Sequence, residues 1–544
     1  MWEKSNKGNS IEEIFKNSVG INDLSEANAW FTKHYNHEYH IQGLKEAVEF
    51  AKEFKHKPVR IVGDYDVDGT ASTSILLFGL RWSGFNNVTY RIPHRFSEGF
   101  GINETIVDEI DEGLIICCDN GLAQNEAIKK AKKKGLSVII LDHHLPESDA
   151  GTTIESCADY VIDPAAYPET ADFCGYCGAG LCYKFCEILL NYDKVKLAKL
   201  SCLAAIATIA DVMQLKEENY VLVKNAMSKF MLNIQTNVPG LYAILAKAGK
   251  MNHLTAKDIA FAVAPVINAS SRMNDTGADN VVEILSYYGP YEDILDKVDA
   301  LFAVNNLRKE AQKDALTQAH DIISKNKMEQ NVPLVVYIPD VHEGIVGIVA
   351  GQLADEYRTP TFVVTNVGDG QLKGSARTSG NYDIKKNLDI VSKLLTVYGG
   401  HKEAAGLTLP EENLKAFCKT LSKNANDFIR DDETDSIYYD LEIDAKDISD
   451  CIKGLEKFEP FGEGNPMPIF KINNFDSVGL KQLLGSDKNT VKLRGKYADA
   501  LGFKMAERMS FIEDSPKYSF IGTLADNYFR NNVTHQIEFI DFAI

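Results

Sequence analysis

Short apolar runs alternate with longer polar stretches between residues 59 and 162. The runs read VRIVG, NVTYRIP, GLIICC, LSVIIL and ADYVI. They are short and rich in β-branched residues, which favours buried strands over helices. The stretch NEAIKKAKKKG, between the third and fourth runs, predicts a helix that ends at Gly135. Strands that alternate with helices indicate a parallel sheet with both faces covered.

The pattern changes several times farther along the chain. Residues 180–290 are mainly helical in pattern, and residues 294–325 keep apolar positions near helical spacing. As one helix, the latter segment would span about 45–50 Å, enough to join two domains. A second α/β pattern begins at PLVVYIP, continues through TPTFVVTN and ends near residue 425. The acidic stretch RDDETDSIYYD predicts a linker, and the alternation in NTVKLRGKYADALGFKM and YSFIGTLADNY predicts a small β-barrel.

These changes indicate an α/β protein of several domains, because a chain of 544 residues is too long for one hydrophobic core. The predicted parts are a helical cap (1–50), a parallel-sheet domain with a helical extension (51–290), a connecting helix (291–330), a smaller α/β domain (331–428) and a C-terminal β-barrel (436–544).

Composition excludes some classes of protein. The formal net charge of −19 argues against a generally basic nucleic-acid binder or a membrane-surface protein, although a local basic groove can coexist with an acidic body. No apolar stretch reaches the length of about 18 residues that a membrane span needs. Ten cysteines, several inside apolar runs, are typical of a reducing compartment, so we expect a cytoplasmic protein without membrane contact.

One pair of cysteines has the spacing of half a zinc site. CGYC contains Cys174 and Cys177, but a second matching pair is missing from the sequence. We therefore interpret both residues as packing cysteines.

Acids and histidines follow four of the predicted strands. They are Asp64, Asp66 and Asp68 after VRIVG, Asp119 after LIICC, Asp142, His143 and His144 after LSVIIL, and Asp163 after ADYVI. The carboxyl ends of parallel strands meet at one rim of a sheet, where ligands bind. Aspartate is common in any turn after a strand. Four such segments with a doubled histidine nevertheless favour a functional site.

A calcium loop is an alternative explanation for DYDVDG. Such a loop requires a bidentate glutamate at its twelfth position. Counting from Asp64, the twelfth residue is Ile75, and the preceding segment is a predicted strand instead of a helix. The calcium loop is therefore rejected.

A dinuclear metal centre explains the cluster better. Three carboxylates this close repel one another unless a cation lies among them. A mixed oxygen and imidazole ligand set favours Mn²⁺, Fe²⁺ or Zn²⁺ over calcium, with Mg²⁺ as a further candidate. Two ions about 3.5–4 Å apart typically serve the cleavage of phosphate esters. The residues therefore predict a metal-dependent phosphoesterase.

The motifs also resemble those of a known family. DYDVDG, CDNG and DHH in this order resemble the DHH phosphoesterase superfamily, and GGHKEAAG (399–406) is similar to the signature of its DHHA1 domain. The stretches IPHRFSEGFG, VINASSRMND, NNLRKE, HEGIVGIVAGQLADEYRTP, KGSART and FEPFGEGNPMPIF resemble RecJ-type single-strand-specific exonucleases. The resemblance covers residue 55 to the end. It implies a parallel-sheet DHH domain, a long connecting helix, a smaller α/β DHHA1 domain and a C-terminal OB-type β-barrel.

The resemblance implies a set of catalytic metal ligands. They are Asp66, Asp68, Asp119, His143 and Asp211, the last standing at the family's fourth motif in IATIADVM. Asp119 is expected to bridge two ions, and His144 to face the scissile phosphate.

One position of the metal set departs from the family. Many superfamily members carry a histidine where this chain has Val62, so we expect Asp64 to add to the first metal site. Asp163 matches no family role, and we interpret it as structural.

The resemblance also implies substrate contacts. The family-like motifs contain the candidates His144, Arg272, Arg308, Arg377, Gly399, Gly400 and His401. The residue pattern adds Arg95, which follows a strand toward the rim, and Lys492 and Arg494, whose charges near Tyr497 suit binding of a single strand. His401 can donate to a phosphate, and glycines let a strand approach closely. For each arginine an ion pair within the protein is an open alternative, as is a solvated strand face for Lys492 and Arg494. Ser271 and Tyr220 replace residues that are usually glycine and arginine in the family.

The resemblance implies a metal-dependent exonuclease that releases 5′-mononucleotides from the 5′ end of single-stranded DNA, in DNA repair and recombination. It implies two divalent ions (Mn²⁺ preferred, Mg²⁺ as the alternative), a monomer, and a single-strand-binding protein and a helicase as partners. Two alternatives stay open. One is a phosphodiesterase for short oligonucleotides or cyclic dinucleotides, against which the C-terminal domain argues. The other is a non-catalytic single-strand-binding replication partner, which we expect would have lost ligands.

Overall fold

The computed structural model describes residues 1–23, 25, 40–145, 156–230, 233–251, 254–425, 428–430, 436–479, 481–485, 488–510, 515–529 and 532–544. The chain forms two compact units. The first comprises Met1–Pro265, Ala278–Val298 and Asp435–Ile544, and the second comprises Val266–Gly277 and Asp299–Thr434.

The first unit contains a five-stranded parallel sheet. Its strands are β2 (Val59–Val62), β3 (Val88–Arg91), β4 (Leu114–Cys118), β5 (Ser137–Leu141) and β6 (Tyr160–Ile162). The order is β3-β2-β4-β5-β6, and every pairing is parallel. Each of the five apolar runs forms one strand, which confirms the predicted parallel sheet. The order of the strands reverses between β2 and β4, which is where doubly wound sheets bind ligands.

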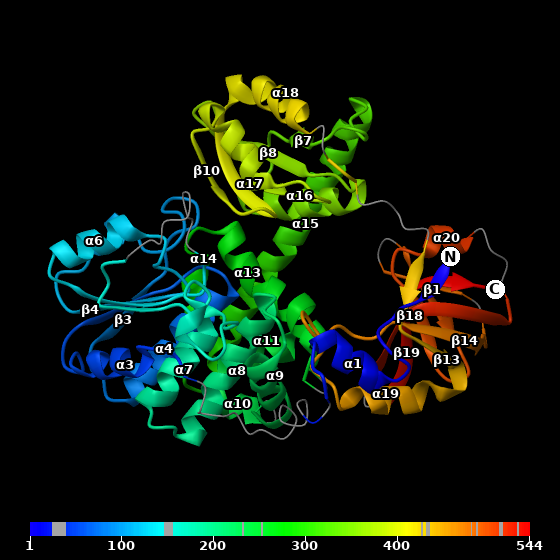
Figure 1. The fold of residues 1–544 in the computed structure, drawn as a ribbon, viewed down its shortest axis with the longest axis horizontal. Helices are drawn as coiled ribbons and strands as arrows, with labels where there is room; N and C mark the ends of the chain where they lie inside the picture. The colour runs from blue at the N-terminus through cyan, green and yellow to red at the C-terminus, as the bar shows by residue number, and fades with distance from the viewer. Residues whose placement is uncertain are drawn as a thin grey trace. The chain divides into compact units, whose positions relative to one another are not determined.

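Helices cover both faces of this sheet (Figure 1). On one face, α5 (Glu104–Asp108) and α6 (Asn125–Lys133) contribute Ile106 and Ile128 to an apolar cluster with Val62 and Val138. On the other face, α4 (Val67–Trp82) packs against α7 (Gly178–Leu189) and α8 (Lys194–Ala210). Nearly every residue of α4 is buried, so its amino end is held firmly at the rim of the sheet.

The rest of this part of the first unit is helical, as predicted. The helices are α3 (Leu44–Lys52), α9 (Glu217–Asn225), α10 (Ile234–Asn237), α11 (Pro239–Lys247), α12 (Ala256–Asp258) and α14 (Gly277–Leu285), the last beginning at the unit boundary.

A buried ion cluster ties α7 to α9. The Lys184 ammonium lies 2.9 Å from a carboxylate oxygen of Glu187 and 3.2 Å from one of Glu218. The Tyr176 hydroxyl donates to the same oxygen of Glu218 at 3.0 Å. All four residues are buried. The cluster fixes α7, whose amino end reaches the rim of the sheet.

The C-terminal part of the first unit is a seven-stranded sheet in the order β13-β14-β18-β19-β17-β16-β15. Its strands are β13 (Leu441–Asp444), β14 (Phe470–Asp476), β15 (Gln482–Leu484), β16 (Thr490–Arg494), β17 (Asp499–Gly502), β18 (Lys517–Phe529) and β19 (Asn532–Ala543). Two helices accompany it, α19 (Ile448–Glu456) and α20 (Ala506–Ser510). Phe470, Phe475 and Phe520 lie in its apolar core.

The N-terminal residues pack against this C-terminal part. Strand β1 (Trp2–Lys4) pairs in parallel with β12 (Ile437–Tyr439), and the Trp2 indole donates to Asp541 at 2.7 Å. Helix α1 (Ile11–Val19) places Phe15 in a cluster with Tyr220 and Phe458. Part of the segment predicted as an acidic linker is therefore strand β12, while its residues 431–435 lie outside the described residues. A pairing partner more than four hundred residues away explains why local polarity misled the prediction.

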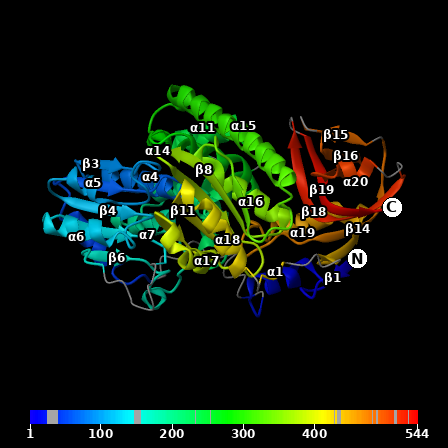
Figure 2. The same ribbon diagram turned by 90° about the horizontal axis from the view of Figure 1, so that it is seen from above.

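The second unit contains a mixed sheet in the order β10-β11-β9-β8-β7. The strands are β7 (Leu334–Tyr337), β8 (Thr361–Gly368), β9 (Gln371–Arg377), β10 (Val397–Gly400) and β11 (Ala404–Pro410). The helices are α13 (Ala264–Met273), α15 (Leu295–Lys325), α16 (Val346–Tyr357), α17 (Ile384–Ile390) and α18 (Leu414–Asn424). Figure 2 shows α15 as one uninterrupted helix, as the spacing of its apolar residues predicts; it begins in the first unit and continues into the second. Among the described residues, no helix is both long and apolar enough to cross a membrane.

The ion cluster gives a prediction for stability. Lys184→Met leaves two buried carboxylates without their cation, so we expect the free energy of unfolding to fall by about 3–5 kcal/mol. The matched control is Lys196→Met, because Lys196 pairs with Asp193 at 3.7 Å and both side chains are 38% exposed. This control is expected to change stability by less than about 0.5 kcal/mol. Thermal unfolding followed by circular dichroism compares the two, and equal melting temperatures would contradict the prediction.

Candidate metal centre

Three aspartates leave the carboxyl end of β2 in different directions. The Asp66 side chain accepts from the Gly69 amide at 3.1 Å and caps α4. Asp68, in the first turn of α4, accepts from the amides of Gly178 and Ala179, both at 2.7 Å. Positive amino ends of two helices therefore bind two of the three carboxylates, which offsets part of their mutual repulsion.

Asp64 has less support from the protein. Asp64 is 3% exposed, and its Oδ1 atom has no hydrogen-bond partner among the described residues. A buried carboxylate oxygen without a donor is costly unless a cation compensates it.

Asp119 follows β4 in a left-handed backbone conformation, with φ of 62°. Its amide donates to the Leu141 carbonyl at 2.9 Å, and its Oδ1 lies 3.0 Å from Nε2 of His143. The next residue, Asn120, donates to the carbonyls of Val62 and Cys118 at 3.1 and 2.9 Å. Asn120 thereby joins the turn after β4 to β2, on which the first three aspartates depend.

The DHH segment follows β5. One oxygen of Asp142 accepts from the amides of His143 and His144 at 2.8 and 3.2 Å, and it lies 2.8 Å from Nδ1 of His144. The other oxygen accepts from the Leu122 amide at 3.1 Å. Asp142 therefore orients His144 and points no free oxygen toward the aspartate cluster.

Asp211 completes the cluster from the carboxyl end of α8. Its side chain is 30% exposed, and its Oδ2 lies 3.7 Å from Nε2 of His143. The following residue, Val212, is exposed and has φ of 55°, which is a rare conformation for a β-branched side chain. Strain of this kind is concentrated at functional sites.

The side chains form three groups in which the ligand atoms lie within 4.8 Å of one another. The first group is Asp64, Asp66 and Asp119, and the second is Asp68, His143 and Asp211. The third is Asp119, His143 and His144, and it connects the first group to the second. Asp119 belongs to the first group and lies close to His143 of the second, as a bridging ligand would.

The carboxylates are electrostatically crowded. Burial, followed by the charge of neighbouring aspartates, raises the pKa of Asp64 and Asp119 well above the ordinary value, and it raises that of Asp66. The same causes raise the pKa of Asp211 to about 8. These groups repel one another when ionised, so the donor set fits divalent cations, which would hold all of them as carboxylates.

The adjacent histidines differ in protonation. Burial lowers the pKa of His143 despite the nearby Asp68, so its imidazole is neutral at pH 7 and can act as a ligand. Burial also opposes the charge on His144, but the hydrogen bond and charge of Asp142 outweigh it and raise the pKa of His144 to about 9. His144 is therefore a cation at pH 7, and its side chain is 44% exposed.

The remaining substrate candidates are distributed over both units. In the first unit, the Arg95 guanidinium lies over the Tyr65 ring at 4.6 Å, beside the aspartate loop. Lys492 lies 2.8 Å from Asp499 in an ion pair, and Arg494 is exposed at the end of β16. The ion-pair alternative is thus realised for Lys492.

In the second unit, Arg308 donates to Gln312 and Asn305 at 2.6 and 2.8 Å. Arg377 donates to Ser375 and to the Ala376 carbonyl at 2.9 and 2.8 Å. The acceptors of these hydrogen bonds are neutral groups.

The turn between β10 and β11 carries the GGH motif. His401 is exposed there, and Gly399 and Gly400 end β10. Gly400 has φ of 138°, and a Cβ on it would lie 2.4 Å from the Ala404 carbonyl oxygen, so only glycine fits. Arg272 lies at the carboxyl end of α13, half-buried.

The two departures from the family pattern are buried. Tyr220 donates to the Glu459 carbonyl at 2.9 Å and is fully buried, so it joins α9 to the C-terminal part of its unit. Ser271 is 1% exposed within α13. Both side chains serve packing in this structure.

Asp163 and the CGYC cysteines lie beside the cluster without joining it. Asp163 accepts from the Ala166 amide at 2.9 Å, and burial raises the pKa of its carboxyl to about 7. Cys177 caps α7 through the Gly180 amide, and Cys174 donates to the Pro168 carbonyl at 3.4 Å. Among the described residues, neither cysteine belongs to a group that could hold a metal.

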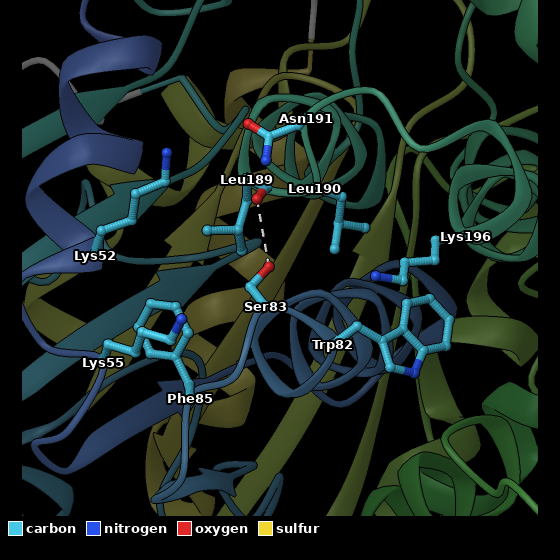
Figure 3. Close-up of a pocket in the computed structure, with 9 residues that line it drawn as sticks. All are labelled: Lys52, Lys55, Trp82, Ser83, Phe85, Leu189, Leu190, Asn191 and Lys196. Atoms are coloured by element: carbon cyan, nitrogen blue, oxygen red, sulfur yellow. Dashed lines mark hydrogen bonds between the residues drawn. The ribbon is translucent and has the colours of Figure 1, made fainter.

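A cavity of about 270 Å³ in the first unit lies away from this cluster. Figure 3 shows Lys52, Lys55 and Lys196 around it with Trp82 and Phe85. Helices α3, α4 and α7 end there, so the lysines complement the negative ends of helix dipoles. None of the clustered aspartates or histidines lines it.

Three supporting features were not assigned as site residues from the sequence: Asn120, Asp142 and the amide pair of Gly178 and Ala179. Asn120 and Asp142 could have been found in the sequence, because each is a polar residue close after a predicted strand. The amide pair had no such signal, because its side chains carry no polar group.

Three family models match the chain. The N-terminal domain of the DHH family matches residues 58–210, the DHHA1 domain matches residues 331–427 and the RecJ OB domain matches residues 439–541. The chain therefore carries a DHH domain, a DHHA1 domain and a RecJ OB domain, in this order. This assignment agrees with the motifs that carry the resemblance in the sequence.

RecJ proteins resemble the chain over most of its length. The single-stranded-DNA-specific exonuclease RecJ of Bacillus subtilis is 29% identical over 522 residues, which cover 93% of this chain and 64% of that protein. RecJ of Escherichia coli is 29% identical over 402 residues, which cover 69% of this chain and 68% of that protein. The chain thus spans about two thirds of the length of these relatives.

Solved RecJ structures share the fold. A manganese complex of RecJ from Thermus thermophilus has a TM-score of 0.78 at 24% identity, covering 98% of this chain and 76% of that chain. Another RecJ structure bound to manganese has a TM-score of 0.59 at 29% identity, covering 72% of this chain and 96% of that chain. With the three domain models, these matches confirm the predicted fold class.

The helix that binds Asp68 gives a prediction for metal affinity. A Cβ on Gly178 would lie 2.7 Å from the Cβ of Asp119, so Gly178→Ala must displace that carboxylate. We expect Mn²⁺ affinity to fall by about 10- to 100-fold, as for other changes around metal ligands. Gly180→Ala on the same helix is the control, because its Cβ would come no closer than 3.4 Å to a neighbour. Calorimetric titration with Mn²⁺ measures both, and equal affinities would refute the displacement.

The raised pKa values predict a link between pH and metal. Because the folded-state pKa values exceed those of the unfolded chain, protonation stabilises the metal-free fold at low pH. This contribution is lost as the pH rises from about 4 toward about 8, the pKa of Asp211. Divalent ions replace the protons. The gain in melting temperature on adding Mn²⁺ should therefore be larger at about pH 8.5 than at about pH 6. A gain that is constant or shrinks across this range, measured against chelator, would contradict the prediction.

Proposed function

We propose that the chain is a metal-dependent exonuclease that removes 5′-mononucleotides from the 5′ end of single-stranded DNA. One observation carries the proposal: six side chains that could bind metal converge in two groups, and Asp119 of the first lies 3.0 Å from His143 of the second. The DHH, DHHA1 and RecJ OB domains, and relatives named as single-stranded-DNA-specific exonucleases, support the substrate.

The two groups would hold the two ions. Asp64 and Asp66 would bind the first, Asp68, His143 and Asp211 the second, and Asp119 would bind both. When bound, the ions would neutralise the scissile phosphodiester and make water a stronger nucleophile. Mn²⁺ is the proposed ion because His143 adds an imidazole to an oxygen set, and Mg²⁺ is the alternative.

His144 and Arg95 would act on the phosphate from outside the ligand set. The imidazolium of His144 is held by Asp142 and exposed on its other side, so it can donate to a phosphate oxygen. Arg95 carries its charge on the same rim, where it can bind a second phosphate or a free 5′ end. Charge placed where the transition state gains it is the main catalytic contribution of such residues.

The arginines of the second unit, together with Gly399, Gly400 and His401, would bind the sugar–phosphate backbone. Arg494 would do so in the C-terminal part of the first unit, with stacking on Tyr497. The 5′ polarity, the monomeric state and partners such as a single-strand-binding protein and a helicase follow from the RecJ resemblance alone, and the cytoplasmic location follows from the cysteine composition. They form part of the proposal.

Removal of single ligands tests the metal centre. Asp119→Asn and His143→Ala should each lower cleavage of single-stranded DNA by at least about 1,000-fold. Asp119 and His143 connect the two groups of proposed metal ligands, so either change disturbs both. Circular dichroism should show an intact fold in both. Asp108→Asn is the control, because Asp108 lies in the same unit, is 61% exposed and pairs with Lys130 on the surface. Undiminished metal-dependent cleavage by both ligand variants would contradict the proposal.

Labelled substrates test strandedness and polarity. Single- and double-stranded DNA with a 5′ or a 3′ label is digested with Mn²⁺, Mg²⁺ or chelator. The proposal expects immediate release of the 5′ label as a mononucleotide from single strands, and no cleavage with chelator. Preference for dinucleotides over long strands would instead favour a phosphodiesterase for short oligonucleotides.

A further inference from the structure

An aromatic side chain that belongs to none of the assigned groups lies against the metal centre. The Phe100 ring meets the His144 imidazole at 5.3 Å between centroids and 72° between planes. It meets the Tyr65 ring at 6.4 Å and 83°. Tyr65 lies between Asp64 and Asp66 in the chain, so Phe100 links both sides of the cluster.

Phe100 is held in place although it is exposed. Its side chain is 39% exposed, while the backbone around it is fixed by hydrogen bonds. The amides of Glu98 and Gly99 donate to the His94 carbonyl at 2.8 and 3.1 Å. Two residues after the ring, the Ile102 amide donates to Asn120 at 3.1 Å. The same Asn120 supports the turn of Asp119, so the position of the ring is coupled to the metal centre.

The surroundings of this ring are unusual for an exposed phenylalanine. The rings that meet it, those of His144 and Tyr65, both belong to loops of the metal centre. Tyr65, in the loop after β2, carries Arg95 at 4.6 Å over its ring. Phe100, which is 39% exposed, therefore has surface to offer a ligand beside His144.

We propose that Phe100 stacks against the nucleobase of the nucleotide whose phosphate lies at His144. The proposal rests on the proposed function, since it requires a single strand at this centre. His144 and Arg95 offer charge to the phosphates, and the ring offers an apolar face to the base attached to them. Every base has such a face, so this contact would hold the substrate without reading its sequence.

The contact also accounts for a preference for single strands. A base that stacks on a side chain has left its own helical stack. In a duplex that base is paired and stacked on its neighbours, and freeing it costs energy. Phe100 would thus stabilise the binding of an unpaired terminal nucleotide but not that of a paired one.

The test couples the side chain to the base. Oligonucleotides carry either normal nucleotides or a single abasic residue at the first, second or third position from the 5′ end. On normal strands, Phe100→Ala should lower kcat/KM by about tenfold, and Phe100→Trp should retain the wild-type value. At the position that stacks, removal of the base should lower wild-type kcat/KM by a similar factor and leave Phe100→Ala within about twofold of wild type. Phe261→Ala is the matched control, because Phe261 is 77% exposed in the same unit.

Binding provides a second readout. Strands with 2-aminopurine at the same positions are titrated with wild-type protein and with Phe100→Ala in the presence of Mn²⁺, using the Asp119→Asn background to prevent cleavage. Stacking quenches this fluorophore, so quenching at one position should be lost in Phe100→Ala and kept in Phe261→Ala.

The outcomes separate the two proposals. If Phe100→Ala lowers kcat/KM equally on normal and abasic strands, or leaves the quenching unchanged, the stacking proposal is overturned while the nuclease proposal stands. If the wild-type protein cleaves no strand, the nuclease proposal fails. Stacking is then decided by the fluorescence alone, and wild-type protein that gives no quenching overturns it.

Discussion

Mutual repulsion among buried aspartates is the constraint around which the first unit is built. Asp64, Asp66, Asp68 and Asp119 are held within a few ångströms at the ends of two adjacent strands, and burial raises the energy of each charge. The protein itself offsets only part of this cost. The amino ends of α4 and α7 bind one carboxylate each, and the His144 imidazolium, 3.9 Å from Asp119, offsets a further part of the negative charge. Divalent cations supply the missing charge, so the same crowding that destabilises the metal-free fold creates affinity for metal.

The fold meets this constraint with buried supports. Helix α7 can present its amides to Asp68 because the Lys184 cluster anchors its middle and Gly178 allows its end to approach Asp119. Asn120 binds the turns after β2 and β4 to each other. The carboxylate oxygens of Asp142 accept from backbone amides and contact the His144 ring. They do not contact the His143 ring, which can therefore face the metal centre. Two adjacent histidines thus take opposite protonation states, one neutral and one cationic, which suits their proposed roles as metal ligand and phosphate donor.

The sequence predicts the strands and the approximate site because both depend on short-range patterns. Apolar runs locate β2, β4 and β5, and an acid directly after a parallel strand must lie at the rim. Pairing within the site depends on contacts between distant segments, as for the amides of Gly178 and Ala179 on Asp68, about 110 residues away. The pairing of β1 with β12 joins residues from nearly opposite ends of the chain, so the local pattern of polar residues cannot predict it either. Phe100 illustrates another limit, since an exposed phenylalanine in a loop has no pattern that separates it from ordinary surface.

Val62 shows how the metal centre tolerates the loss of a ligand found in related proteins. Its side chain is completely buried in the apolar cluster with Ile106 and Val138, on the face that α5 and α6 cover. A ligand at that position would have to displace part of this core. Asp64, two residues later, is instead buried with one carboxylate oxygen that no protein donor satisfies, and it groups with Asp66 and Asp119. An unsatisfied buried oxygen would be selected against in a purely structural role, because it costs about 1–3 kcal/mol or more when charged. Its retention here is understood if a cation binds it, which supports the proposal that Asp64 takes the place of the absent histidine.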